Sequence, residues 1–80
     1  MVKLEVLGPG CKNCERLADN VREAAADLDL DYELVKIEDL NEITSYGVMN
    51  TPGLAVNGDV KIQGEVASVA DIQAILEDYN

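Results

Sequence analysis

Residues 2–17 read VKLEVLGPGCKNCERL, and they contain a first predicted strand, a turn and the start of a first predicted helix. Alternating side chains over residues 2–7 favour a strand whose even-numbered side chains form the better-buried face. The Gly-Pro-Gly that follows ends this strand, and apolar residues then recur at helical spacing from Cys11 to Leu28. The cysteines Cys11 and Cys14 therefore fall at the start of a helix that directly follows a strand.

The rest of the chain continues the alternation of strands and helices. The apolar pattern predicts a strand, a short helix, a two-stranded hairpin and a last helix at residues 32–37, 40–46, 54–56 with 60–62, and 69–79. Gly47 can end the short helix in the left-handed conformation, and Ser68 can cap the last helix. Asn57-Gly58 is typical of a type I′ hairpin turn. The order β-α-β-α-β-β-α predicts one α/β domain over residues 1–80, with a four-stranded mixed sheet and helices on both faces.

The charge balance narrows the choice of partners. Sixteen Asp and Glu residues against six Lys and Arg residues give a net charge of −10, which repels phosphate backbones and anionic lipids. We therefore expect neither nucleic acid nor a membrane as a partner. The sequence has no signal-peptide pattern and no apolar run of about 20 residues, so we expect a cytoplasmic protein. We also expect a monomer. A permanent structural disulfide is rare in that compartment, which favours redox or metal chemistry for the cysteine pair.

Helix-start placement gives the two cysteines different chemistry. The N-terminus of a helix offers unpaired N–H groups and a partial positive charge, and both stabilise a thiolate. We therefore expect a depressed pKa for Cys11, which Lys12 supports with its positive charge. Cys14 lies one turn later on the inward face, where its sulfur can reach Cys11. The pattern predicts Cys11 as nucleophile and Cys14 as resolving thiol, with a redox-active Cys11–Cys14 disulfide in place of any cofactor.

Metal binding is the main alternative reading of the pair. Two thiolates make half of a tetrahedral zinc site, and the chain has no His and no further Cys, so no metal site is predicted in the monomer. Copper(I) accepts two thiolates, and a soft-metal carrier therefore stays open as an alternative function. Such carriers usually end on a strand, whereas this chain ends on a predicted helix. A third possibility is an adaptor whose cysteine pair senses redox state without turnover.

Three segments together resemble one known family. They are Gly8 to Cys14, Tyr46 to Pro52 running into Asn57-Gly58, and Gly64 ahead of the last helix. A lone C-x-x-C is a weak signal, but C-x-x-C followed by Thr-Pro ahead of a hairpin is specific. The chain resembles the thioredoxin superfamily, and most of all its small thioredoxin/glutaredoxin-like redox-active disulfide proteins of bacteria and archaea. The predicted element order is likewise that of a minimal thioredoxin-like fold.

The resemblance implies a thiol-disulfide oxidoreductase that reduces protein disulfides. Its partners would be disulfide-bearing proteins and an upstream reductase. The resemblance also implies that the Thr51-Pro52 peptide bond is cis and faces the disulfide, where the Thr51 backbone pairs with an extended substrate segment.

Two charged residues match positions that act in proton transfer in thioredoxins. Glu5 precedes Cys11 at the place of the buried acid, and Lys36 lies on the second predicted strand at the place of the lysine. The resemblance therefore implies a possible role for both in moving a proton during exchange. The alternation of the first strand equally allows Lys3 and Glu5 to form an ordinary half-exposed face.

Overall fold

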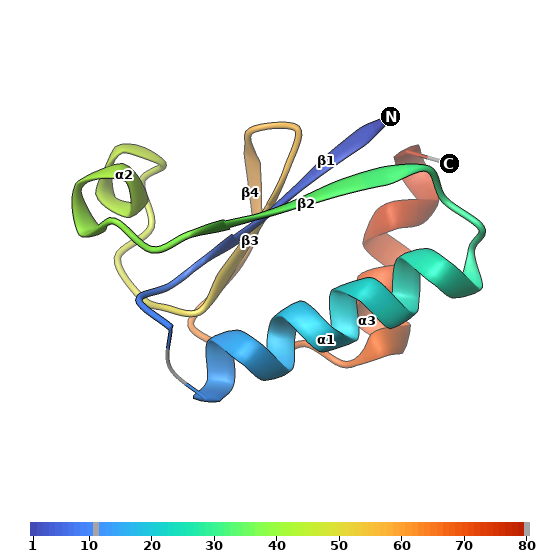
Figure 1. Cartoon of the computed structure of the whole chain (residues 1–80), viewed down its shortest axis with the longest axis horizontal. Helices are drawn as coiled ribbons and strands as arrows, with labels where there is room; N and C mark the ends of the chain where they lie inside the picture. Colours follow the sequence, from blue (N-terminus) through green and yellow to red (C-terminus); the bar gives the residue numbers. More distant parts are fainter. Residues whose placement is uncertain (11, 80) are drawn as a thin grey trace.

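A computed structural model describes residues 1–10 and 12–79, and this part of the chain forms one four-stranded sheet with three α-helices (Figure 1). The elements in chain order are β1 Val2–Leu7, α1 Lys12–Asp27, β2 Tyr32–Ile37, α2 Leu40–Ser45, β3 Gly53–Val56, β4 Asp59–Gln63, α3 Val69–Leu76 and the 3-10 helix η1 Glu77–Tyr79. The strand order is β2-β1-β3-β4. β1 is parallel to β2 and antiparallel to β3, and β3 is antiparallel to β4. The predicted element order and mixed sheet are confirmed.

The observed bounds differ from the predicted ones mainly at helix ends. The predicted start of the first helix at Cys11 lies outside the described residues. α2 ends one residue before Tyr46, whose backbone N–H caps the helix on the carbonyls of its last turn. The last helix tightens into η1, because 3-10 geometry is common where an α-helix runs out of partners.

Local turn chemistry matches the sequence. Gly47 follows α2 with φ +84°, and Asn57 and Gly58 have φ +51° and +90°, the pair of positive angles of a type I′ turn. The Ser68 hydroxyl accepts a hydrogen bond from the Asp71 amide at 3.2 Å and so caps α3. Each of these residues acts through its own backbone or close neighbours, which is why the local pattern predicts it.

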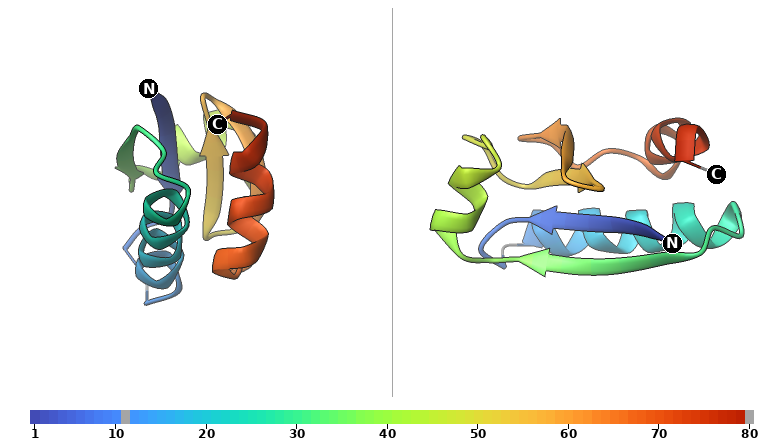
Figure 2. Two further views of the ribbon diagram at one scale, coloured as in Figure 1. Left: turned by 90° about the vertical axis from the view of Figure 1, so that its right-hand side faces the viewer. Right: turned by 90° about the horizontal axis from the view of Figure 1, so that it is seen from above.

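One face of the sheet packs against α1 and α3, which lie side by side (Figure 2). Its core is formed by alternate strand residues together with the inner faces of the two helices, chiefly Leu4, Val6, Leu54, Val56, Leu17, Val21, Ile72 and Leu76. All of these side chains are buried. Because successive strand side chains point to opposite faces, the intervening residues belong to a second layer.

That second layer lies under α2. Leu7 and Ala55 pack there against Ile43 of α2 and against Val48. The predicted placement of helices on both faces is therefore confirmed. β1 is central and covered on both sides. Its even-numbered residues are all buried, and on the other face Glu5 and Leu7 are buried while Lys3 is exposed, so the reading of Lys3 and Glu5 as an ordinary half-exposed face is wrong for Glu5.

The ends of several elements meet at one end of the molecule. The carboxyl ends of β1 and β2, the first turn of α1 and the segment between α2 and β3 all lie there (Figure 1). Segments that carry the predicted site residues are thus brought together from both halves of the sequence.

Candidate functional site

A close approach at Gly8 brings the end of β1 near both Cys14 and Thr51. Cys14 lies in the first turn of α1, with 5 % of its surface exposed. A Cβ atom placed on Gly8 would lie 2.2 Å from the Cys14 sulfur and 3.8 Å from Thr51 Cβ. Glycine at this position therefore lets the end of β1 lie close to the second cysteine, with Thr51 nearby.

The predicted nucleophile Cys11 lies outside the described residues. The next residue, Lys12, is the first of α1 and is exposed to solvent. Its positive charge therefore lies at the amino end of that helix, where the predicted role in thiolate tuning requires it.

Hydrogen bonds hold the Thr51-Pro52 segment onto the end of β4. The peptide bond between these two residues is cis, as the family resemblance implied. The Pro52 carbonyl accepts a hydrogen bond from the Gly64 amide at 2.8 Å, and the Met49 amide donates to Gln63 Oε1 at 3.3 Å. Pro52 is buried, whereas Thr51 and Met49 are exposed beside it. The exposed Thr51 thus lies near Cys14, and the exposed Met49 lies two positions before it in sequence.

Lys36 contacts α1 and forms an ion pair there. Its ammonium lies 2.9 Å from each carboxylate oxygen of Glu15, the residue after Cys14. The hydrogen bonds from Lys36, and then its charge, hold the pKa of the Glu15 carboxyl below its ordinary value. The ion pair therefore offsets a negative charge at the first turn of α1.

Glu5 is buried on the face of the sheet opposite to α1, and its carboxylate has two hydrogen-bond partners. Only 2 % of its surface is exposed. Its Oε2 accepts a hydrogen bond from the Tyr46 hydroxyl, and its Oε1 accepts one from the Gly58 amide at 2.9 Å. The hydrogen bond to this carboxylate, together with burial, raises the pKa of Tyr46 to about 12.

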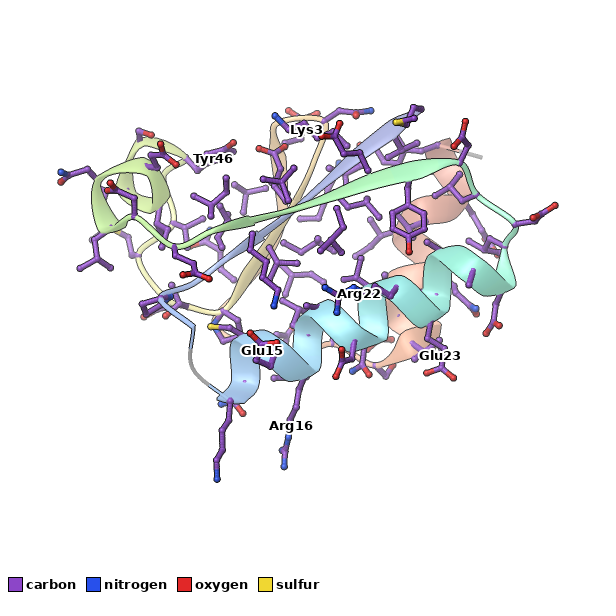
Figure 3. The ribbon with its side chains drawn as sticks, in the orientation of Figure 1. Lys3, Glu15, Arg16, Arg22, Glu23 and Tyr46 are labelled. Atoms are coloured by element: carbon purple, nitrogen blue, oxygen red, sulfur yellow. The ribbon has the colours of Figure 1, made fainter. Side chains whose placement is uncertain are left out.

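Glu5 and Lys36 are not brought together. In the β1–β2 register Glu5 lies opposite Val35 and Val6 lies opposite Lys36, so the two charged side chains point to opposite faces. Figure 3 shows the labelled residues Tyr46 and Glu15 on opposite sides of the sheet, where Tyr46 is the partner of Glu5 and Glu15 is the partner of Lys36. The roles of Glu5 and Lys36 in proton transfer stay predictions.

Sequence reasoning missed the partners of these charges. The sequence places Tyr46 at the end of a helix, Gly58 in a turn and both in the segments that resemble the family, but no pattern links either of them to Glu5. Nor does a pattern link Glu15 to Lys36, from which it is separated by 21 positions. Glu5 itself is marked by being an acid in a mostly apolar strand.

Neither a cluster of metal ligands nor a membrane-spanning helix is present in the part of the chain that the structure describes. Within residues 1–10 and 12–79, no three or more His, Cys, Asp and Glu side chains are grouped so that they could hold a metal ion. None of the helices in that part of the chain is both long and apolar enough to span a bilayer.

Comparison with known proteins identifies the family. The family described as thioredoxin domain matches residues 2–77, which include both the C-x-x-C and the Thr-Pro segments. The chain belongs to the thioredoxin domain family. A thioredoxin of Methanothermobacter thermautotrophicus is 45 % identical over 76 residues, covering 95 % of this chain and 99 % of that protein. A thioredoxin of Methanocaldococcus jannaschii is 37 % identical over 79 residues, covering 99 % of this chain and 91 % of that protein. As a member of the thioredoxin domain family, the chain is a thiol-disulfide oxidoreductase.

Proposed function

We propose that this chain reduces disulfide bonds of proteins through a dithiol couple formed by Cys11 and Cys14. The observation that carries the proposal is the nearness of both the buried Cys14 sulfur and the exposed Thr51 to Gly8. A resolving thiol and an exposed residue of the Thr51-Pro52 segment lie near each other there. An extended segment of a substrate could pair with that edge while its disulfide faces the cysteines.

The first step is attack by the Cys11 thiolate on one sulfur of the substrate disulfide. The substrate S–S bond breaks, a mixed disulfide forms between Cys11 and that sulfur, and the second substrate sulfur leaves with the electron pair and takes up a proton. The adjacent Lys12 and the amino end of α1 support the thiolate form of Cys11. The Lys36–Glu15 pair helps, because it neutralises a carboxylate one position after Cys14.

The second step is attack by the Cys14 sulfur on Cys11. The mixed disulfide breaks, the substrate leaves as a dithiol, and a Cys11–Cys14 disulfide remains. Two electrons have then passed to the substrate, and an upstream reductase of the cell returns two electrons. The chain needs no cofactor for either step. It acts as a monomer in the cytoplasm in this proposal.

The substrate contacts are assigned to the Thr51-Pro52 segment. Thr51 is an exposed residue whose backbone would pair with the substrate, and the carbonyl of the buried Pro52 accepts a hydrogen bond from the Gly64 amide. A relay from Glu5 to Lys36 has no part in the proposal, because the two side chains lie on opposite faces of the sheet.

Trapping of the mixed disulfide tests the proposal. Cys14→Ser should leave the first step intact and stop the second, so that covalent adducts with insulin accumulate and disappear on addition of dithiothreitol. Cys11→Ser is the matched control and should trap nothing. Wild-type protein should in parallel accelerate insulin reduction by dithiothreitol.

Copper(I) carriage predicts a different outcome. Both thiolates would then act as equivalent ligands, so each serine variant would weaken copper(I) binding and neither would accumulate adducts. Tight copper(I) binding by the wild type, with no adduct in Cys14→Ser and no insulin reduction, would replace the oxidoreductase mechanism with the carrier.

A further inference from the structure

One buried carboxylate holds both ends of the segment that carries Thr51 and Pro52. Residues 46–58, here called the Thr-Pro segment, begin at Tyr46, whose hydroxyl donates to Glu5 Oε2. The same segment ends at Gly58, whose amide donates to Glu5 Oε1 at 2.9 Å. These two contacts span 41 and 53 positions of sequence, so neither is a consequence of local structure.

The first half of the Thr-Pro segment is held at a few points. Between α2 and β3 the chain leaves helical geometry at Gly47, buries Val48, bonds the Met49 amide to Gln63 Oε1 and exposes Met49 to Thr51. The position of this stretch depends on these contacts and on where its first residue is fixed. Tyr46 is fixed to β1 by the hydrogen bond from its hydroxyl, in addition to the cap that it forms on α2.

Glu5 is suited to this task by its place in the sheet. It points to the face covered by α2, on the central strand β1, and it is buried with both oxygens satisfied. A buried carboxylate with both oxygens hydrogen-bonded is a fixed anchor, since moving either partner away would leave a buried oxygen without a hydrogen bond. β1 leads directly into Gly8, which lies close to Cys14 with Thr51 nearby. The anchor and the site are thus on one rigid strand.

We propose that Glu5 and Tyr46 are positioning residues, which hold the Thr-Pro segment against the cysteine pair so that protein substrates can dock on it. The inference rests on the proposed function, because it concerns how the substrate-binding edge is held. It gives the buried acid of this chain a task other than carrying a proton. Substrates that need no backbone pairing should not depend on the anchor.

Two substitutions separate anchoring from proton transfer. Tyr46→Phe removes the hydroxyl that reaches Glu5 and leaves the carboxylate in place. Glu5→Gln removes the titratable proton but keeps the anchor, since its amide oxygen can accept from Gly58 and its amide nitrogen can donate to the Tyr46 oxygen. Tyr32→Phe is the matched control, because it removes a phenolic hydroxyl from β2 on the other face.

The assay compares a large and a small disulfide substrate. With insulin, Tyr46→Phe should raise KM by about three- to tenfold with kcat nearly unchanged, the factor expected for loss of one hydrogen bond. With 5,5′-dithiobis(2-nitrobenzoate), its rate should equal that of the wild type. Glu5→Gln should keep the wild-type KM and the wild-type pH profile, and Tyr32→Phe should behave as wild type with both substrates.

Hydrogen exchange gives a second measurement that does not depend on turnover. In Tyr46→Phe, exchange should rise in residues 47–53 and stay unchanged in α3. A rise throughout the chain would mean general destabilisation and would overturn the inference, as would an unchanged KM for insulin. A Glu5→Gln variant with a shifted pH profile would assign Glu5 to proton transfer instead. Failure of the wild type to reduce insulin at all would contradict the proposed function itself, and the positioning role with it.

Discussion

Replacement of Gly8 by alanine tests the meeting point of the two site segments. The added Cβ would lie 2.2 Å from the Cys14 sulfur, where ordinary contact begins at 3.4 Å, and 3.3 Å from Cys14 Cβ. To regain ordinary contact the Cys14 sulfur has to move by about 1 Å, from 2.2 Å to 3.4 Å, and Cys14 Cβ has to move by a few tenths of an ångström. Overpacking of this kind costs about 1–3 kcal/mol. In a domain of this size each kcal/mol lowers Tm by about 4–8 °C.

The displacement should also slow the second chemical step. A shift of about 1 Å in a reacting group can lower a rate by about 10²-fold, so resolution by Cys14 should slow by one to two orders of magnitude while attack by Cys11 changes little. Reduced protein mixed with 5,5′-dithiobis(2-nitrobenzoate) releases one thionitrobenzoate on attack and a second on resolution. Gly8→Ala should therefore leave the fast phase and delay the second.

A core variant provides the control for Gly8→Ala. Val21 is fully buried on α1 beyond the first turn, so Val21→Ala should lower Tm without delaying the second phase. Two phases in Gly8→Ala that match those of the wild type, with an unchanged Tm, would refute the close approach on which the candidate site is built.

Three further outcomes are expected. Iodoacetamide at pH 7 should label Cys11 before Cys14, because Cys14 is buried. Mass spectrometry after a brief pulse measures the order, and earlier labelling of Cys14 would contradict the assigned roles. With the other tyrosines replaced by Phe, the tyrosinate absorbance of Tyr46 should appear only near pH 12. Because folding raises this pKa, the stability due to the Tyr46 contact is complete below about pH 10 and is lost as pH rises through 12, which alkaline melts of Tyr46→Phe and wild type would measure. The pKa of Glu15 is lowered on folding, so the small stabilisation by Lys36 should be present above pH 4.5 and vanish as pH falls further. If the difference in stability between wild type and Glu15→Gln were the same well above pH 4.5 and well below it, the prediction would be contradicted.

Most of the fold was accessible to sequence reasoning because its signals are local. Alternation predicted β1 and β2, and helical spacing predicted α1. Gly47, Asn57-Gly58 and Ser68 act within a few residues of their own positions, so turn and capping chemistry located them. The bounds shifted only where a helix end or a strand end depends on a few more hydrogen bonds.

The environment of Glu5 was not accessible in the same way. An acid in a strand with one apolar face usually points to water, and only the coverage of β1 on both sides makes Glu5 a buried residue. Its partner Tyr46 lies 41 positions away, and no periodic pattern connects the two. Gly8 likewise reads as a strand breaker, whereas its value lies in the contact with Cys14 and Thr51.

The central place of β1 has a consequence for how the chain folds. Its residue Leu4 pairs with Leu34 on one side and with Val56 on the other, so β1 needs a partner strand that the ribosome makes only after α1, β2 and α2. Pairings so distant in sequence pay the entropy of closing long loops before any contact rewards them. The β1–β3 pairing therefore has to wait until the hairpin has left the exit tunnel. The hydrogen bond from Gly58 to Glu5 forms in that same event, so a nascent chain acquires its sheet and the proposed anchor of its Thr-Pro segment together.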